Sequence, residues 1–421
     1  MALVTRITIF SAFFSVLYAQ SVLFPYGEEV GDDLMVEGDE ATTSSIILSE
    51  DLIIFGDHVY TFHVNTNGVI SVNNAFVTFY PKFIPFTISP DEPSFFIAPF
   101  YADIDTSGGR GNIYYRYVGR ADENDYLFKR VQRMVDAAFF DIRFINKTFE
   151  GEFMLIVTWD SVSYFSEEDK ANHTNTFQAV LISDGEVESY AIFNYENISW
   201  TTGVSPNSKA NPDGTGGTPG AMAKVGFNYG DGVKGFMLNV SGTDDVINMD
   251  ETSNIGIPGR WIFRLDQAEI EAPSETIRTR CLPGWTFLEI EYACYKFYNE
   301  HRNWWEADRK CKREGGQLAT VTTPEKNDFI AGSITGGVKT WVGATRNPMN
   351  ETLWEWITDE PWYFHKWRKR EPNNWGDAED CLNTNFVRPG LWNDHFCQNR
   401  KAFICEMIPI ADESRGGEET S

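Results

Sequence analysis

The chain has 421 residues, is 42% hydrophobic and 15% aromatic, and carries a formal net charge of −26. This length suits two domains of roughly 150 residues or more each, and the apolar content excludes a mainly disordered chain. The acidic balance argues against a nucleic-acid partner, because a phosphate backbone is held by a surplus of lysine and arginine.

Residues 1–19 predict a cleaved signal peptide. Arg6 precedes an apolar run over residues 7–17, and the small residue Ala19 follows it. A membrane anchor is the alternative, but the run is shorter than the roughly 20 residues that a bilayer requires. No later segment is long and apolar enough to cross a membrane. We therefore expect a secreted, extracellular protein with no transmembrane segment.

Residues 20–266 predict an all-β domain. Tyr60, Phe62 and Val64 alternate along one candidate strand, and Asn67-Gly68 after them is typical of a hairpin turn. Residues 176–195 repeat this scheme, and residues 153–165 and 259–265 are further candidate strands. This region has no cysteine, so we expect apolar burial alone to hold it together.

One acidic segment of this region has the beginning of a calcium loop. Asp103, Asp105 and Ser107 have the spacing of the first EF-hand ligands, but Tyr114 stands where that loop needs a glutamate. A turn with structural aspartates is the better interpretation.

Five segments of the first region occur in an order that resembles a known family. They are LFPYG (23–27), VNTNGVISV (64–72), IAPFYADIDT (97–106), GNIYYR (111–116) and VTWDSVSYF (157–165). Together they resemble the nidogen-type extracellular (NIDO) domain, which also occurs in tectorin-like and mucin-like adhesion proteins. The resemblance implies an adhesion module with partners among extracellular-matrix proteins and without catalytic residues.

The polar residues 267–280 predict a linker, and a compact, cysteine-rich segment follows. Asn303 is a good N-cap for a helix that ends at Gly315-Gly316, and Pro324 suits the first turn of a second helix. Residues 340–344, 353–357, 381–386 and 402–406 are candidate short strands.

All the cysteines of the chain lie in this last third, and their even number in a secreted protein predicts a disulfide framework. The short spacings typical of zinc sites are absent, and six cysteines allow 15 pairings. The cysteines are Cys281, Cys294, Cys311, Cys381, Cys397 and Cys405.

Carboxylate and amide side chains gather between Arg370 and Cys397 with almost no cation among them. A solvated acidic loop is the simplest interpretation of any two of these residues. The same stretch lies within a series of segments that resembles the C-type lectin domain. They are CYKF (294–297), WWEADRKC (304–311), GGQLATV (315–321), WVG (341–343), EPN (371–373), EDC (379–381), LWND (391–394) and FICE (403–406).

The resemblance implies an α+β lectin fold over residues 281–407, with two helices, short antiparallel strands and a long calcium-binding loop. It also implies a disulfide pairing, which is Cys281–Cys294, Cys311–Cys405 and Cys381–Cys397. Residues 408–421 then form a disordered tail.

The resemblance further implies one principal Ca²⁺ site whose ligands also bind the sugar. Its residues are Glu371, Asn373, Glu379, Asn393 and Asp394. Calcium takes six to eight oxygens, so this set leaves positions for two neighbouring sugar hydroxyls. In the family, the Glu-Pro-Asn order goes with mannose, fucose and N-acetylglucosamine, whose paired hydroxyls are equatorial, and Pro372 is cis.

An auxiliary calcium site is weaker in this chain. The family pattern implies Asn347, Glu351, Asn374, Glu379 and Asp380. Two of these positions are asparagine where aspartate is usual, so this site has lost charge.

Most tryptophans of this segment are expected in the core, whereas Trp375 lies among the ligand residues and is a candidate for stacking on a sugar. The chain also has five N-x-S/T sequons as candidate glycan sites. They are Asn146, Asn172, Asn197, Asn239 and Asn350.

The sequence thus predicts a secreted, calcium-dependent lectin joined to a matrix-adhesion domain. The alternative is a structural adhesion protein whose lectin-like domain binds protein. An enzyme is not expected, because the serine-elbow, HExxH and CxxC motifs are absent.

Overall fold

The structure is a computed structural model. It describes residues 21–411 except 76–77, 79, 89–94, 121–124, 140–148, 166–172, 203–210, 212, 217–221, 274–278, 289–290, 359–361 and 363. The expected signal peptide, the sequons Asn146 and Asn172, and residues 412–421 of the expected tail lie outside the described residues.

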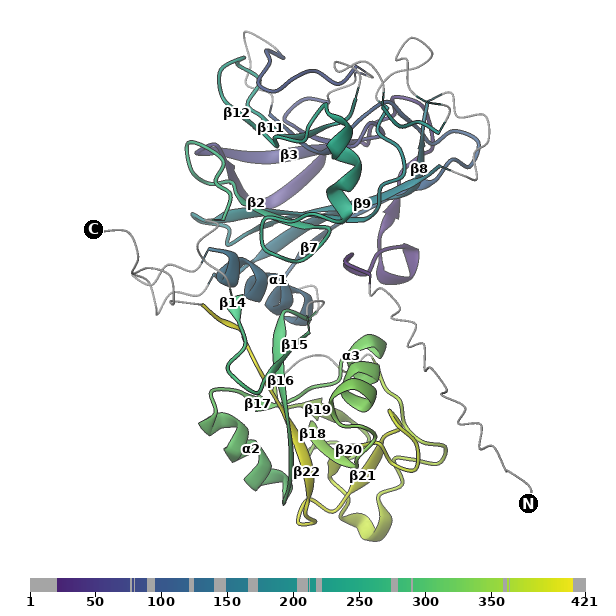
Figure 1. The fold of residues 1–421 in the computed structure, drawn as a ribbon, viewed down its shortest axis with the longest axis vertical. Helices are drawn as coiled ribbons and strands as arrows, with labels where there is room; N and C mark the ends of the chain where they lie inside the picture. Colours follow the sequence, from purple (N-terminus) through teal and green to yellow (C-terminus); the bar gives the residue numbers. More distant parts are fainter. Residues whose placement is uncertain are drawn as a thin grey trace, which may run out of the picture.

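Two antiparallel sheets form the first domain (Figure 1). One has the strand order β1-β7-β8-β9-β10-β13, with β6 on β8, and the other has the order β12-β11-β5-β4-β3-β2. The strands are β1 (Asp33–Leu34), β2 (Ile46–Ile54), β3 (Asp57–Asn65), β4 (Val69–Val72), β5 (Phe96–Tyr101), β6 (Ile104–Asp105), β7 (Asn112–Gly119), β8 (Phe153–Tyr164), β9 (Asn175–Ser183), β10 (Ser189–Asn197), β11 (Lys224–Asn228), β12 (Gly235–Met237) and β13 (Arg260–Arg264). The described residues of this domain also include the 3₁₀ turns η1 (Glu28–Val30) and η3 (Asp244–Asp250).

The main apolar core lies between these two sheets. Alternate residues of β8, such as Leu155, Val157 and Trp159, face the other sheet and are fully buried there. Their neighbours Met154 and Ile156 point to the opposite face and are also buried. Strands that are buried on both faces lose the alternation of polar and apolar residues, because both faces need apolar side chains.

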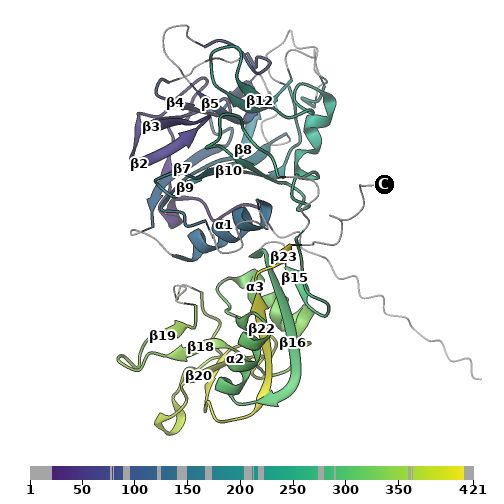
Figure 2. The same ribbon diagram turned by 90° about the vertical axis from the view of Figure 1, so that its left-hand side faces the viewer.

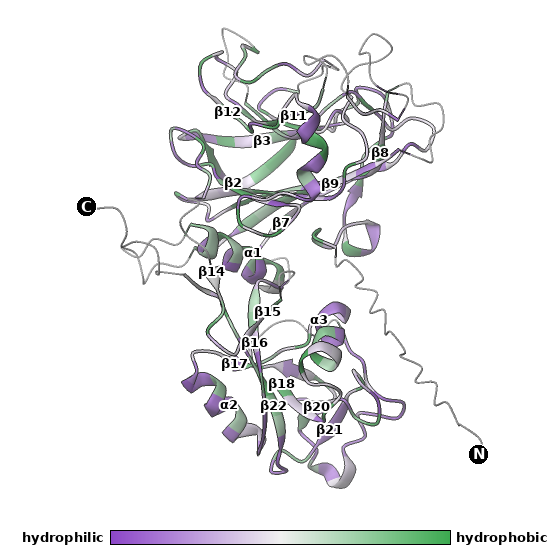
Figure 3. Ribbon diagram, in the orientation of Figure 1, coloured by the Kyte–Doolittle hydropathy of each residue, from purple (hydrophilic) through white to green (hydrophobic). Residues whose placement is uncertain are grey.

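Helix α1 (Asp125–Ala138) covers the second face of the large sheet. Leu127, Val131, Met134 and Val135 recur at helical spacing and are buried against the sheet. The opposite side of α1 is hydrophilic (Figure 3). The first domain is therefore mostly β, and α1 is an element that the sequence prediction of an all-β domain did not include.

The expected hairpins of this domain are confirmed. Strands β3 and β4 pair across the turn at residues 66–68, and β9 and β10 pair across residues 184–188. In the second turn, the carboxylate of Asp184 accepts backbone N–H groups from Glu186, Val187 and Glu188 at 2.8–3.0 Å. A short acidic side chain stabilises this turn by satisfying its free donors.

The second domain is an α+β unit with an eight-stranded sheet of order β15-β16-β22-β18-β20-β21, with β17 on β22 and β19 on β18. Its elements are β15 (Thr286–Leu288), β16 (Ala293–Arg302), α2 (Trp304–Arg313), β17 (Gln317–Leu318), α3 (Pro324–Asp328), η5 (Phe329–Ile334), β18 (Thr340–Arg346), β19 (Trp354–Trp356), η6 (Trp375–Asp377), β20 (Cys381–Thr384), β21 (Asn393–His395) and β22 (Lys401–Met407).

Both helices expected in this domain are confirmed, with the expected ends. The side chain of Asn303 accepts the N–H of Glu306 at 2.9 Å at the start of α2, and Thr323 caps α3. The expected disulfide pairing is also confirmed, as Cys281–Cys294, Cys311–Cys405 and Cys381–Cys397.

The chain enters and leaves the second domain at one place. Strand β14 (Thr279–Arg280) pairs with β23 (Ile410–Ala411), beside α1 (Figures 1 and 2). The expectation of a disordered tail from residue 408 is therefore wrong for Ile410 and Ala411, because their backbone groups pair with β14. The last residues of the expected linker, 279–280, are part of the same ladder.

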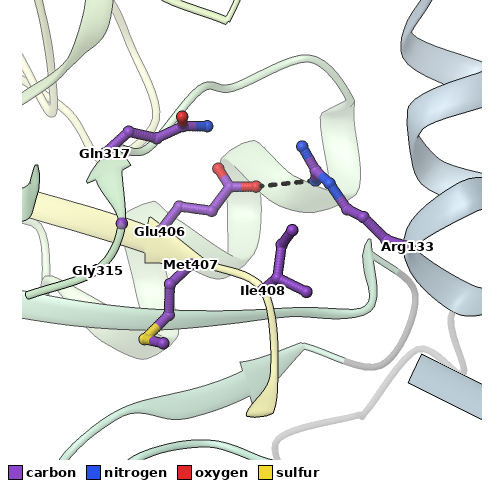
Figure 4. Close-up of a pocket in the computed structure, with 7 residues that line it drawn as sticks. Arg133, Gly315, Gln317, Glu406, Met407 and Ile408 are labelled. Carbon is purple, nitrogen blue, oxygen red and sulfur yellow. Dashed lines mark hydrogen bonds and ion pairs between the residues drawn. The ribbon is translucent and has the colours of Figure 1, made fainter. Parts of the chain in front are cut away.

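Side chains from both domains meet along α1. Tyr292 of the second domain is 2% exposed and belongs to the apolar cluster under α1. Lys129 Nζ donates to the carbonyl of Thr358 at 2.9 Å. Arg133 reaches Glu406 across a small open pocket lined by Gly315, Gln317, Met407 and Ile408 (Figure 4). The two domains are thus held by apolar packing and by polar contacts.

Candidate metal centre

The expected ligand residues lie on and beside β20 and β21, on the side of the second domain away from α1 (Figures 1 and 2). The irregular segment before β20 is tied to the sheet by Trp392, whose N–H and C=O pair with Lys366 and Arg368 at 2.9 and 3.0 Å. The Glu371–Pro372 peptide bond is cis, as expected. These backbone hydrogen bonds hold the irregular segment before β20 against the start of β21.

Asp394 is the centre of the cluster and is fully buried. Its Oδ1 accepts the N–H of Asn373 at 3.1 Å, and its Oδ2 accepts the N–H of Asn374 at 2.7 Å. Oδ2 also accepts a hydrogen bond from Arg346 Nη2 at 2.8 Å. One carboxylate of β21 therefore fixes both the loop backbone and a cationic side chain.

Glu379 holds the other side of the same loop. Its Oε2 accepts the N–H of Trp375 at 3.1 Å, and its own N–H donates to Asn374 Oδ1 at 3.1 Å. Burial and the nearby Asp394 raise the pKa of Glu379, and the Trp375 N–H and Arg346 oppose this rise. The residue is only 6% exposed, so its charge is poorly solvated.

Glu371 has the least satisfied carboxylate of the cluster. Its side chain is 4% exposed, Oε1 lies 3.6 Å from Arg368 Nη1, and the buried Oε2 has no hydrogen-bond donor among the described residues. Burial and the repulsion of Asp394 raise the pKa of Glu371. A buried carboxylate oxygen without a donor is costly, and a cation would remove this cost.

The donor set fits calcium in its chemistry. It has three carboxylates and two amides, which are hard oxygen ligands. The two remaining residues flank Asp394, since Asn373 donates to its carboxylate and Asn393 precedes it on β21. No group of three or more His, Cys, Asp or Glu side chains in the described residues already has metal-binding geometry. The fit therefore rests on the donor types and on the unsatisfied oxygen of Glu371.

Comparison with known proteins assigns both domains. Residues 60–267 match the nidogen-like domain, and residues 300–407 match the lectin C-type domain. The chain consists of a nidogen-like domain followed by a C-type lectin domain. Alpha-tectorin of Gallus gallus is 35% identical over 67% of this chain, and the match spans only 13% of alpha-tectorin.

Other relatives cover the lectin domain. A lectin of Pleurodeles waltl is 34% identical over 133 residues, which span 30% of this chain and 75% of that lectin. Among solved structures, the carbohydrate-recognition domain of the mouse scavenger receptor C-type lectin is 28% identical and matches 31% of this chain and 98% of that domain, with a TM-score of 0.28. Nidogen-like and C-type lectin domains are non-enzymatic kinds of domain.

The residues expected for the auxiliary site of the lectin domain surround a side chain that the sequence analysis missed. The Arg346 guanidinium donates to the backbone oxygens of Glu351 and Glu379 and lies 3.4 Å from the carboxylate of Asp380. The amide oxygens of Asn347 and Asn374 already accept backbone N–H groups at 2.7–3.1 Å. No sequence pattern marks Arg346 as a partner of these residues, because Glu379 and Asp380 lie in a segment that is distant from it in the chain.

Tryptophans of the lectin domain divide as expected. Those predicted in the core are buried or packed against it, and they are Trp341, Trp354, Trp356, Trp367 and Trp392. Trp375 is 70% exposed and meets Phe396 edge-on, with 5.8 Å between ring centroids. Its backbone N–H holds Glu379, so an exposed aromatic face lies next to the ligand cluster.

Three candidate glycan sites lie in the described residues. Asn197, Asn239 and Asn350 are all exposed. The side chain of Asn350 accepts hydrogen bonds from Thr352 N and Oγ1 at 3.2 and 2.7 Å. Their exposure is compatible with an attached glycan, and their glycosylation stays a prediction.

No helix in the part of the chain that the structure describes is long and apolar enough to cross a membrane.

Proposed function

We propose that this protein is a secreted, calcium-dependent lectin for sugars with equatorial neighbouring hydroxyls, as in mannose, fucose and N-acetylglucosamine. The nidogen-like domain would attach it to the extracellular matrix. The observation that carries the proposal is the buried carboxylate of Glu371, which lies beside Asp394 with one oxygen that has no donor.

The residues that would hold calcium are Glu371, Asn373, Glu379, Asn393 and Asp394. Calcium would supply a positive centre that polarises two sugar hydroxyls and neutralises the carboxylates. Each hydroxyl would donate its proton to a carboxylate and accept an N–H from an amide. The order of Glu371 and Asn373 around cis Pro372 decides which side of the sugar meets an acceptor and which meets a donor.

The extracellular location is supported by the relatives, since alpha-tectorin and the nidogens suggest an extracellular-matrix protein. The disulfides agree with an oxidising compartment. The exposed ring of Trp375 would stack on a sugar face next to the ion, which extends the contact beyond two hydroxyls.

The proposal is tested with the full chain on a mannose resin. Retention should require calcium, and EDTA should release the protein. Glu371→Gln should lower calcium affinity and sugar retention by about tenfold or more, because calcium affinity depends on the number of charged ligands and the amide carries no charge. Asp377→Asn is the matched control, since Asp377 is an exposed acid of the same loop outside the ligand set.

The second candidate is an adhesion protein whose lectin domain binds protein surfaces. Retention on a matrix-protein surface that EDTA leaves unchanged, together with no retention on any sugar resin, would favour it. Calorimetry with calcium alone separates the two candidates further, because only the lectin needs the ion.

A further inference from the structure

Arg346 lies at the end of β18, next to the candidate calcium cluster. Its side chain is only 8% exposed, and the ring of Trp354 covers the guanidinium at 4.9 Å. The backbone N–H of Arg346 donates to Asp380 O at 2.9 Å. A charged side chain that is this well buried must be paired, because an unpaired buried charge is very costly.

Four oxygens from three separate segments surround the guanidinium. Nη1 donates to Glu351 O at 2.7 Å. Nη2 donates to Glu379 O at 3.1 Å and to Asp394 Oδ2 at 2.8 Å. Nε lies 3.4 Å from Asp380 Oδ1. The planar donors of arginine suit such a set of carboxylate and carbonyl oxygens.

These contacts join the segments that the auxiliary calcium site of the sequence analysis was expected to join, namely those of Glu351, Glu379 and Asp380. The guanidinium, which contacts the backbone oxygens of Glu351 and Glu379 and lies 3.4 Å from Asp380 Oδ1, opposes binding of a divalent cation there, because two positive centres a few ångströms apart repel strongly in a buried site.

We propose that the guanidinium of Arg346 takes the place of the auxiliary calcium ion. We further propose that it orders the ligand loop, residues 371–380, before the principal calcium binds. Asp394 transmits the effect, because Arg346 holds its Oδ2 while the same carboxylate holds the N–H groups of Asn373 and Asn374. Arg346 is thus a positioning residue, and the lectin domain binds one calcium ion. The number of calcium ions bound per chain rests on the proposed function, whereas the ordering of the loop by Arg346 does not.

The loop order is tested by hydrogen–deuterium exchange of residues 371–380 in the full chain, in EDTA. The wild type should protect these amides, and Arg346→Gln should exchange them at least tenfold faster. Arg346→Lys keeps a charge without the planar donors and should give intermediate exchange. Arg388→Gln, an exposed arginine of the same domain, should behave as the wild type. Equal exchange in the wild type and both Arg346 variants would overturn the positioning role.

The stoichiometry is tested by equilibrium dialysis with calcium alone. The wild type should bind one ion per chain, and Arg346→Asp should bind a second, weaker ion. Two ions in the wild type, or one ion in a folded Arg346→Asp variant, would overturn the replacement of the auxiliary calcium. A third outcome separates the two proposals. If the wild type binds no calcium, but Arg346→Gln still exchanges the amides of residues 371–380 faster than the wild type, the proposed function is contradicted and the positioning role of Arg346 is supported.

Discussion

Arg133 of α1 and Glu406 of β22 form an ion pair between the two domains, with 3.4 Å between Nη1 and Oε1 (Figure 4). Glu406 is 2% exposed and also holds Lys326 Nζ at 2.9 Å and the N–H of Thr320 at 3.2 Å. A single carboxylate therefore joins the packing of the lectin domain to its contact with the nidogen-like domain.

This sharing predicts unequal losses of stability. Arg133→Gln should lower the free energy of unfolding by about 1 kcal/mol or less, because Lys326 still pairs with Glu406. Glu406→Ala should lower it by roughly 3–5 kcal/mol, because the buried Lys326 ammonium loses its carboxylate partner. Urea denaturation at neutral pH measures both, with the exposed Lys312→Gln as a control. Equal losses in the two variants would show that Glu406 acts only through Arg133.

Protons and calcium should compete at the candidate site. Without calcium, burial and Asp394 raise the pKa values of Glu371 and Glu379, so these carboxyls hold protons at a higher pH than ordinary glutamates near 4.3. Calcium favours their charged forms and must displace those protons. Calcium affinity should therefore fall with acidification, beginning above the ordinary glutamate range.

Calorimetry in buffers of different ionisation enthalpy measures the protons released per calcium. Glu371→Gln should release fewer protons than the wild type. Sugar retention should fail at a lower pH when calcium is raised. A pH profile of retention that does not move with calcium concentration would refute this linkage.

Exchange of the two residues beside cis Pro372 should change sugar preference. In the variant Glu371→Gln with Asn373→Asp, both positions still offer calcium an oxygen, so calcium should still bind. The affinity for mannose should fall about tenfold or more, because a mispaired buried polar group costs roughly 1–3 kcal/mol. Titration with calcium and then with mannose and galactose checks this. Unchanged mannose affinity would mean that these residues do not contact the sugar.

The Asp136 side chain should make the nidogen-like domain less stable at neutral pH than at pH 4. Burial raises its pKa to about 6, although its carboxylate accepts the N–H of Phe149 at 2.8 Å. A raised folded-state pKa gives stability that is complete below the unfolded pKa near 3.9 and is lost as the pH rises through about 6.

Asp136→Asn keeps the acceptor and removes this titration. Its free energy of unfolding relative to the wild type should rise between pH 4 and 7 by about 1–2 kcal/mol, after allowance for partial exposure. Denaturant titrations at several pH values measure the difference. A difference that is constant with pH would show that Asp136 titrates as an ordinary aspartate.

Much of the fold is predictable from the sequence, for different reasons in the two domains. In the nidogen-like domain, alternation and the turn at Asp184 located the hairpins. In the lectin domain, the caps of α2 and α3 and the motif order located both helices and all three disulfides. Helix α1 was missed although Leu127, Val131 and Met134 have helical spacing, because the surrounding pattern is β.

The ligand set of the candidate site was predictable because its residues lie within one stretch of chain with fixed offsets. Arg346 was not, because its partners at positions 351, 379 and 394 meet it only after the sheet has formed. Tyr292 is a similar case, since a buried tyrosine in a sequence does not reveal which domain buries it.

The short ladder of β14 and β23 places Thr279 opposite Ala411 and Arg280 opposite Ile410. The chain therefore enters and leaves the lectin domain at one place, where the two ends of the domain lie side by side, and domains with neighbouring ends tolerate transplantation well. For protein engineering, this ladder is a natural junction at which one recognition module could be exchanged for another. A replacement would need to supply an aromatic side chain at the position of Tyr292, so that the surface under α1 stays covered.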